Sequence, residues 1–287
     1  MSKPLGVLYV ATEADPFAKT GSLADLAGKL PKTVKALGHD IRVMLPGYGF
    51  INNRRFQIHN LLRMKDIEIP VGDGMERAYI KSSYLNGENH KVQVYFVAND
   101  RYFNREGLYC HPETKKYFTD NDERFIFFCR GVLETLKRLG WQPKIIHCND
   151  WQTGLIPMYL KTIYKDDPFF KNVRTIFTAY SLASHGAFPR SSIGKTGVSL
   201  SMFSKSCDFN AGLNFLEAGL AYADIVTTLG SKAEKGISIS PQNGLGKALQ
   251  ARKNNIVSMS NNFHNGTGQE LLATKFVDVY RDLAKNS

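Results

Sequence analysis

The segment Lys19–Asp25, with the sequence KTGSLAD, decides how the first part of this chain folds. An apolar run over Leu5–Val10 precedes it and is typical of a buried strand, and apolar residues recur at helical spacing over Leu23–Leu37 after it. The segment therefore lies on a strand–helix loop, where backbone N–H groups and the positive end of a helix dipole suit a phosphate. Gly21 would let the backbone approach such a ligand, and Lys19 would add a point charge. An ordinary turn with a solvated Lys19 is the alternative.

Length and composition indicate a globular protein with a sizeable core. The chain has 287 residues, and 43% of them are hydrophobic. Its apolar runs are too short to span a bilayer, and MSKPLGVLYV leads directly into a strand without the apolar core of a signal peptide. The four cysteines are scattered, with no CxxC pair, which is typical of reduced thiols. We therefore expect a cytoplasmic protein that does not associate with membranes.

The net charge of +11 favours an anionic partner, such as a phosphate-bearing ligand or a polymer. The basic residues are dispersed, and no zinc-finger or RNP-like pattern interleaves them with aromatic residues. We therefore do not expect a nucleic-acid partner.

The order of the elements predicts an α/β fold. Gly38 follows the first helix where a left-handed C-cap is expected, and a strand over Asp40–Leu45 completes a β-α-β unit, so a parallel sheet is predicted. Residues 62–98 alternate with a two-residue period, which indicates antiparallel strands added to the parallel core. One Rossmann-like, doubly wound, mainly parallel sheet follows from the remaining pattern: helix Asp122–Leu139, strand Lys144–His147, helix Thr153–Tyr164, strand Thr175–Ala179, helix Asn214–Ala223, strand Ile225–Leu229 and a terminal helix Gln269–Lys285.

Polar clusters follow two of the predicted strands. Asp150 would either accept hydrogen bonds from sugar hydroxyls or cap the next helix, and Trp151 would either stack on a sugar ring or fill the core. Tyr180 and Ser181 follow the neighbouring strand. His147 lies inside a strand, so we expect a core histidine. No catalytic triad, nucleophile elbow or metal-spaced cluster occurs, so we expect no metal, and the residues alone indicate a crevice for an anion and a polyol without naming a reaction.

Five segments in the same order resemble motifs of bacterial glycogen synthases and plant starch synthases. These enzymes are retaining glucosyltransferases with two facing Rossmann-like domains, the GT-B fold. KTGSLAD is similar to the family's KTGGLAD. The other four segments are YFTDNDERF at Tyr117–Phe125, HCNDWQTGLIPMYL at His147–Leu160, NFLEAGLAYADIVTTL at Asn214–Leu229 and GLGKALQARKNNIVSMSNN at Gly244–Asn262.

The resemblance implies a role for several residues. Lys19 and Gly21 would face the diphosphate of a sugar nucleotide, with ADP-glucose as the donor and no other cofactor. The residues that would lie near the glucosyl or acceptor site are Asp25, Tyr109, Asp150 and Asn214.

Some positions depart from the family pattern. Ser22 replaces a second glycine, and its Cβ would crowd a ligand or force a different backbone angle. Tyr180 and Ser181 stand where the family has His-Asn, and Glu217 replaces a lysine, which reverses a charge beside the site.

The segments that the family uses to clamp the diphosphate from its second domain have no counterpart in this sequence. We therefore expect a synthase-like domain over residues 1–264, then a linker and tail helix over residues 265–287. Our hypothesis is that a second domain was deleted internally while its final helix stayed, with Leu271, Phe276 and Val279 packed on the first domain. Any amphipathic helix that ends a domain is the alternative.

Three functions are compatible with this sequence. The first is a domain that binds α-1,4-glucan or regulates glycogen metabolism and does not transfer glucose by itself. Stabilisation of the leaving diphosphate is a large catalytic contribution, and the segments that would clamp the diphosphate have no counterpart here. The second is an active glucosyltransferase that a partner chain completes. The third is an interaction module that forms a homo-oligomer or binds a partner chain through the exposed face of the crevice.

Overall fold

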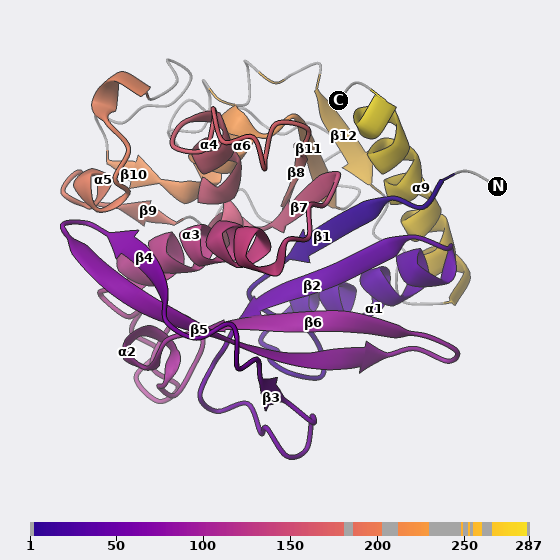
Figure 1. Ribbon diagram of the computed structural model, residues 1–287, viewed down its shortest axis with the longest axis horizontal. Helices are drawn as coiled ribbons and strands as arrows, with labels where there is room; N and C mark the ends of the chain where they lie inside the picture. The colour runs from indigo at the N-terminus through magenta and orange to yellow at the C-terminus, as the bar shows by residue number, and fades with distance from the viewer. Residues whose placement is uncertain are drawn as a thin grey trace.

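The computed structural model describes residues 3–180, 186–202, 212–229, 248, 252, 255–259 and 266–285. Within them, a ten-stranded sheet has the order β12-β11-β8-β7-β1-β2-β6-β5-β3, with β4 paired to β5 (Figure 1). Its strands are β1 (Gly6–Val10), β2 (Asp40–Pro46), β3 (His59–Asn60), β4 (Ile67–Val71), β5 (Gly74–Asn86), β6 (Lys91–Ala98), β7 (Ile145–Asn149), β8 (Arg174–Ala179), β11 (Ile225–Leu229) and β12 (Ile256–Met259). A separate two-stranded sheet pairs β9 (Ala187–Phe188) with β10 (Leu213–Asn214).

Helices cover both faces of the large sheet, as predicted for a doubly wound fold (Figure 1). The helices are α1 (Ser22–Ala36), α2 (Asp100–Phe103), α3 (Asn121–Leu139), α4 (Leu155–Lys161), α5 (Ser192–Lys195), α6 (Phe215–Tyr222) and α9 (Gly266–Lys285), with 3₁₀ turns η1 (Trp151–Thr153) and η2 (Leu200–Met202). α1 packs with α9, while α4 packs with α3 and α6.

The first β-α-β unit forms as the sequence predicts. β1 pairs in parallel with β2, and the residues Val7–Val10 of β1 are fully buried. α1 turns Leu23, Leu26 and Leu30 toward the core at helical spacing. The chain then leaves the helix through Gly38, whose φ of +88° is the left-handed conformation that glycine adopts without strain.

The order of the parallel strands places the ends of β1 and β7 at the centre of the sheet. The chain moves from β1 to β2 in one direction, whereas β7, β8, β11 and β12 follow on the other side of β1. Ligands of such sheets bind beyond the carboxyl ends of the strands at this reversal point. The loops after β1 and β7 therefore frame the candidate site.

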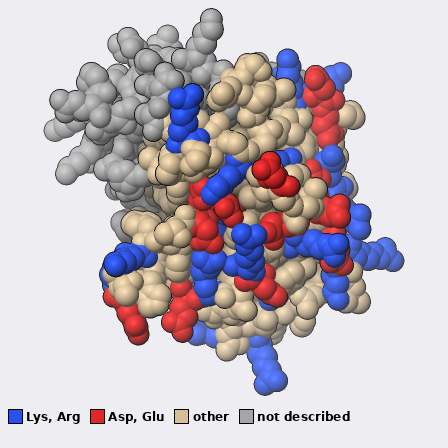
Figure 2. Space-filling model, turned by 90° about the vertical axis from the view of Figure 1, so that its left-hand side faces the viewer, with Lys and Arg blue, Asp and Glu red and all other residues tan. Residues whose placement is uncertain are grey.

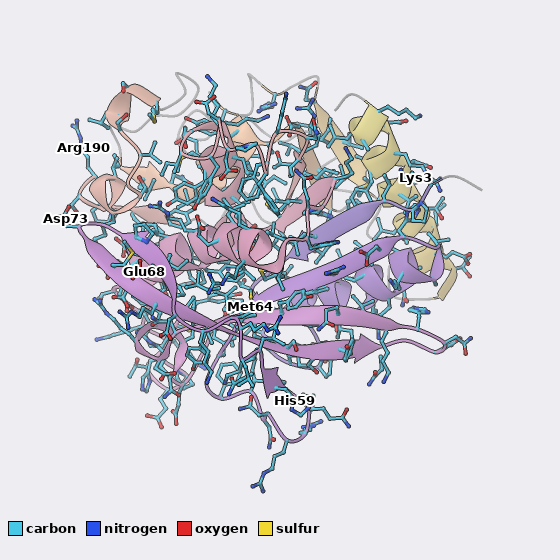
Figure 3. The ribbon with its side chains drawn as sticks, in the orientation of Figure 1. Lys3, His59, Met64, Glu68, Asp73 and Arg190 are labelled. Carbon is cyan, nitrogen blue, oxygen red and sulfur yellow. The ribbon has the colours of Figure 1, made fainter. Side chains whose placement is uncertain are left out.

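The middle of the chain forms the predicted antiparallel strands, β4 with β5 and β5 with β6. β6 also pairs in parallel with β2, a long-range pairing that the local alternation does not indicate. At the tip of the β4–β5 hairpin, where Asp73 lies in Figure 3, the Gly72 N–H donates to the Lys195 carbonyl at 2.8 Å.

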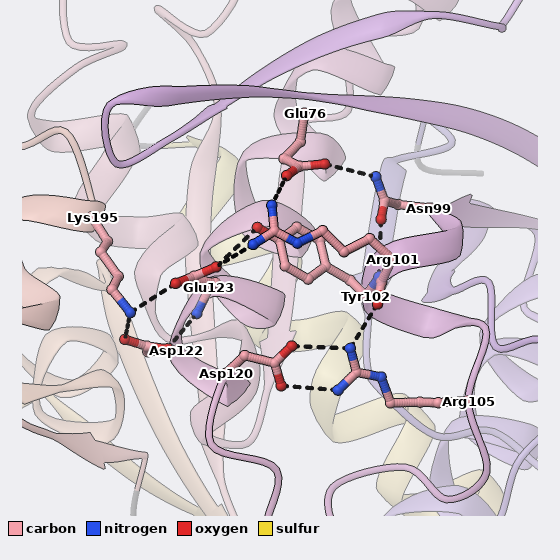
Figure 4. A network of polar contacts seen from close by, with 9 residues as sticks. All are labelled: Glu76, Asn99, Arg101, Tyr102, Arg105, Asp120, Asp122, Glu123 and Lys195. Atoms are coloured by element: carbon pink, nitrogen blue, oxygen red, sulfur yellow. Dashed lines mark hydrogen bonds and ion pairs between the residues drawn. The ribbon is translucent and has the colours of Figure 1, made fainter.

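An ionic network fixes the first turn of α3 against this hairpin and α5 (Figure 4). Lys195 Nζ lies 2.8 Å from carboxylate oxygens of both Asp122 and Glu123. Arg101 bridges Glu123 and Glu76. Because α3 carries acidic residues in its first turn, its dipole adds to the stabilisation. The network holds in place the helix end that borders the candidate site.

Helix α9 packs back on the domain. Phe276 and Tyr280 are fully buried, and the Tyr280 hydroxyl lies 2.7 Å from His147 Nδ1. His147 Nε2 lies 2.6 Å from Thr178 Oγ1, so the prediction of a core histidine is confirmed. Burial lowers the pKa of His147 to about 3.

Two expectations for this segment were wrong. Leu271 is 53% exposed, because it lies on the opposite side of α9 from the buried row Leu272, Phe276 and Tyr280. Residues Gly266–Gly268 belong to the first turn of α9 and form no linker. Val279 is partly buried against the core, as expected.

On the face shown in Figure 2, lysine and arginine side chains alternate with acidic ones, and neither sign dominates. Among the helices that the structure describes, none is both long and apolar enough to cross a membrane.

Candidate functional site

The backbone amides of the β1–α1 loop hold the carboxylate of Glu13. The N–H groups of Thr20 and Gly21 donate to Glu13 Oε2 at 2.5 and 3.3 Å, and the Thr20 hydroxyl donates to Oε1 at 2.7 Å. Glu13 is only 4% exposed. The amides of the loop therefore bind an anion, but this anion is a carboxylate of the same chain. Binding of a phosphate there stays a prediction.

Tyr109 joins the same cluster from a distant part of the chain. Its hydroxyl donates to Glu13 Oε1 at 2.8 Å and accepts from the Thr12 hydroxyl at 2.7 Å. Burial, chiefly, raises the pKa of Tyr109 well above its usual value, so the phenol stays protonated and able to donate.

The loop that carries Tyr109 is held by the first turn of α3. Asn121 Nδ2 donates to the Tyr109 carbonyl at 2.8 Å. The fully buried Arg124 donates from Nη1 to the Leu108 carbonyl at 2.8 Å and from Nε to the Tyr102 carbonyl at 2.8 Å. Burial lowers the pKa of Arg124 to about 10, which still leaves it charged at neutral pH. Arg124 and Asn121 thus act as positioning residues for Tyr109.

Lys19 and Asp25 form an ion pair across the first turn of α1. Lys19 Nζ lies 2.5 Å from Asp25 Oδ1, and the side chains are 49% and 32% exposed. The hydrogen bond to Asp25 raises the pKa of Lys19. In this conformation Asp25 compensates the charge of Lys19. The resemblance assigns Lys19 to a diphosphate and Asp25 to the glucosyl or acceptor site.

Gly21 and Ser22 leave space at the start of α1. Gly21 has an extended backbone with a φ of −154°, and a Cβ added there would meet no atom within 4 Å. Ser22 is exposed and is the first helical residue of α1. Whether its Cβ crowds a ligand stays a prediction.

Asp150, directly after β7, combines a strained backbone with a buried carboxyl oxygen. Its φ of 62° and ψ of 172° lie in a region that residues other than glycine rarely adopt. Its side chain makes no capping hydrogen bond, and Oδ1 is buried without a partner among the described residues. Burial raises the pKa of Asp150 to about 6. The capping interpretation is therefore wrong for the side chain, whose carboxyl instead interacts with the backbone N–H groups of Trp151 and Tyr180.

Trp151 belongs mainly to the core, which is one of the two roles that the sequence left open. It is 7% exposed, and its ring packs edge-on against Phe125 and Phe215 with centroids 5.2 and 6.1 Å away. Its remaining edge lines a cavity of about 330 Å³ whose wall includes Tyr117, Phe118, Asn121, Gly186 and Phe188. Only glycine fits at position 186, because its φ is +57° and a Cβ would lie 2.4 Å from the tryptophan ring.

Tyr180 lies with Asp150 beyond the ends of β8 and β7. Its hydroxyl is buried, and its pKa is raised well above the usual value by burial first and also by the charges of Tyr9 and Asp150. Ser181 lies outside the described residues, as does most of Gly244–Asn262. Asn214 caps α6, since its Oδ1 accepts from the Glu217 N–H at 3.1 Å. Glu217 is buried at 3% exposure in the first turn of that helix.

Several of the predicted site residues lie beyond the ends of β1, β7 and β8, and of these Trp151 lines the cavity in the described part of the chain. Trp151 and Tyr109 have ring centroids 6.3 Å apart, and the charge of Glu13 raises the pKa of Asp150. Asn214 instead caps α6, and its role toward a ligand stays a prediction. In the part of the chain that the structure describes, no group of three or more His, Cys, Asp or Glu side chains could hold a metal ion.

Comparison with known proteins identifies the family of this chain. The starch synthase catalytic domain family matches residues 6–251. The chain belongs to this family. Glycogen synthase from Desulforudis audaxviator is 40% identical over 238 residues, which cover 79% of this chain and 45% of that protein. Glycogen synthase from Chlorobaculum parvum is 37% identical over 266 residues, which cover 89% of this chain and 52% of that protein. The chain thus spans about half the length of these curated relatives.

The fold agrees with that of the starch synthase family. The catalytic domain of starch synthase IV from Arabidopsis thaliana, solved with ADP and acarbose, superposes with a TM-score of 0.76 at 23% identity, over 90% of this chain and 52% of that one. The likeness supports the α/β domain, with its mainly parallel mixed sheet, as the first half of a GT-B fold.

Sequence reasoning missed several residues of this starch synthase-type crevice. Glu13 and Thr12 precede the quoted motif, and their contacts with Tyr109 span 96 and 97 residues of chain. Asn121 and Arg124, the asparagine and arginine of YFTDNDERF, hold the Tyr109 loop, a role that the motif itself does not indicate. A buried acidic residue at the end of a predicted strand is the one signal that could have identified Glu13.

Proposed function

We propose that this domain binds α-1,4-glucan in the crevice beyond β1 and β7 and, alone, does not transfer glucose. The observation that carries the first half is the cavity beside Trp151. Its aromatic wall suits the apolar face of a sugar ring. Asp150 adds an unpartnered buried carboxyl oxygen that would accept from a sugar hydroxyl.

The state of the phosphate loop supports the second half. Departure of a diphosphate needs positioned positive charge and hydrogen-bond donors. In the described β1–α1 loop, Glu13 occupies the amides of Thr20 and Gly21, and Asp25 compensates Lys19. A donor such as ADP-glucose would have to displace both carboxylates without further cations from this loop. We therefore infer weak binding of a sugar nucleotide by this domain and no turnover without another chain or segment.

Co-sedimentation with glycogen tests glucan binding. Tyr117 lines the cavity and is 70% exposed, so Tyr117→Ala should remove contact area without disturbing the core. We expect it to weaken retention on glycogen at least threefold. Leu62→Ala is the matched control, because Leu62 is also exposed, at 77%, and does not line this cavity. Equal retention of wild type and Tyr117→Ala, or no retention of the wild type, would contradict the proposal.

An active glucosyltransferase completed by a partner chain is the second candidate. The strained backbone and raised pKa of Asp150 favour it, because such features concentrate at reactive sites. Incubation of the purified protein with ADP-glucose and glycogen decides: turnover by the protein alone contradicts our preference. If there is neither turnover nor glucan binding, an interaction module remains, and the oligomeric state in solution becomes the measurement that tests it.

A further inference from the structure

A second cavity, separate from the crevice, lies beside α1. Its volume is about 350 Å³, and it is bordered by α1, the segments 15–17 and 55–57, the end of β5 and the start of β6. It shares no lining residue with the cavity beside Trp151. We propose that this cavity binds a sugar phosphate. Nothing in the family comparison assigns it a ligand, and the inference does not depend on the proposed glucan site.

Three cationic side chains line the cavity from three different segments. They are Lys32 on α1, Arg55 on the loop between β2 and β3, and Lys91 at the start of β6. None of the three has a carboxylate within 4 Å among the residues that the structure describes, whereas Lys35 and Lys19 on and beside α1 are both paired. Convergent, unpaired cations attract an anion, and a phosphate dianion accepts hydrogen bonds from several of them at once.

Aromatic side chains form the apolar part of the same cavity. Phe17 and Phe56 meet edge to face with centroids 5.2 Å apart, and Phe17 is also packed on Phe96 at 5.1 Å. Tyr84 stands at the rim with Lys91 Nζ 5.7 Å from its ring centre. A purely ionic site for inorganic phosphate would not need this surface, but the C–H face of a sugar would pack on it.

Polar groups that suit hydroxyls complete the lining. The carboxylate of Asp15 would repel an anion placed beside it but accepts from a sugar hydroxyl, and the amides of Gln57 and Asn86 donate and accept. The combination of cations, one carboxylate, amides and aromatic rings is therefore better matched by a sugar phosphate than by a phosphate or a neutral sugar alone.

The walls are fixed before a ligand arrives. His90 Nε2 lies 2.8 Å from the Lys32 carbonyl, which ties the β5–β6 turn to α1. The Ser83 hydroxyl donates to the Phe56 carbonyl, which ties β5 to the loop that carries Arg55. A pre-formed cavity loses less free energy to ordering when it binds.

Calorimetric titration of the full chain with glucose 6-phosphate tests the proposal, with glucose and inorganic phosphate titrated separately as the two halves of that ligand. We expect saturable binding of glucose 6-phosphate that is at least tenfold tighter than that of either half. Each charge-assisted hydrogen bond is worth about tenfold in affinity. The double variant Arg55→Ala/Lys91→Ala should therefore lower the affinity about 100-fold, and 0.5 M salt should also weaken it.

Matched controls separate this cavity from the crevice and from general surface charge. Arg63→Ala and Lys171→Ala remove exposed cations elsewhere, and Lys19→Ala removes the cation of the phosphate loop. All three should leave the affinity unchanged. A loss with Lys19→Ala would assign the ligand to the crevice and overturn the proposal. Equal binding of inorganic phosphate, or an unchanged affinity in the double variant with a native unfolding temperature, would overturn it as well.

Discussion

Glu13→Gln tests whether the Glu13 carboxylate organises the crevice. The carboxylate accepts four hydrogen bonds, of which the three from Thr20 N, Thr20 Oγ1 and Tyr109 Oη are 2.8 Å or shorter. Glutamine has one acceptor oxygen. In the arrangement that keeps most contacts, that oxygen takes the Oε2 position and receives the two backbone N–H groups. The amide nitrogen then donates to the hydroxyls of Thr20 and Tyr109, and every bond has lost its charge.

The magnitude follows from the difference between charged and neutral hydrogen bonds. Charged bonds contribute about 1.5–3 kcal/mol and neutral ones about 0.5–1.5 kcal/mol, so three short bonds together lose about 3 kcal/mol. Relief from the burial of a carboxylate offsets part of this loss. We expect the free energy of unfolding to fall by about 2 kcal/mol, which lowers Tm by about 3–4 °C in a chain of this size.

Urea unfolding followed by circular dichroism measures this change, with Asp15→Asn as the control. Asp15 is exposed and lies two residues away, so its variant should change stability by less than about 0.5 kcal/mol. A double-mutant cycle with Tyr109→Phe should give a coupling of about 1 kcal/mol or more between Glu13 and Tyr109. If Glu13→Gln unfolds at the same urea concentration as wild type, the carboxylate is not what holds the loop, and the reasoning fails.

Two further changes probe the helix that packs back and the strained aspartate. Tyr280→Phe removes the hydroxyl partner of the fully buried His147 Nδ1, so the free energy of unfolding should drop by about 1–3 kcal/mol in urea titrations, and no drop would refute the contact. Asp150 has a folded pKa of about 6 against 3.8 in the unfolded chain, so its contribution to stability is lost as the pH rises through about 4 to 6. The asparagine of Asp150→Asn does not ionise. The free energy of unfolding of this variant should exceed that of wild type by up to about 3 kcal/mol at pH 7 and equal it below pH 4. Equal free energies of unfolding at both pH values would show that the carboxyl is solvated.

The parts of the fold that local sequence encodes were predicted within a residue or two. The period of apolar residues predicted α1 and α3, and Gly38 marked where α1 ends; in the structure the left-handed Gly140 ends α3 in the same way. The elements that were missed are too short to show a period, such as β3, β9 and β10. Helix α4 is shorter than predicted, ending at Lys161, and β7 extends beyond His147 to Asn149. Such ends depend on tertiary packing that no local pattern contains.

The candidate site divides in the same way. Lys19, Gly21 and Asp150 could be identified because strand ends and loop residues are visible in the sequence, and the fold brings strand ends together. Glu13 could not be assigned its task, because the donors it satisfies come from a loop that follows it and from a tyrosine 96 residues away. The same limit applies to Asp25, which the motif assigns to a ligand and the structure pairs with Lys19.

KTGSLAD is therefore best understood together with the residues that neutralise it. A phosphate loop without an internal anion would expose unsatisfied N–H groups and a lone lysine whenever no ligand is bound. Glu13 and Asp25 remove that cost, and they also set the affinity that an incoming diphosphate must exceed to displace them. A diphosphate that cations of a second protein surface also bind would displace these carboxylates readily. A diphosphate that only this loop binds would not. This state of the loop is what the proposed function rests on, because in that proposal nucleotide binding requires additional positive charge.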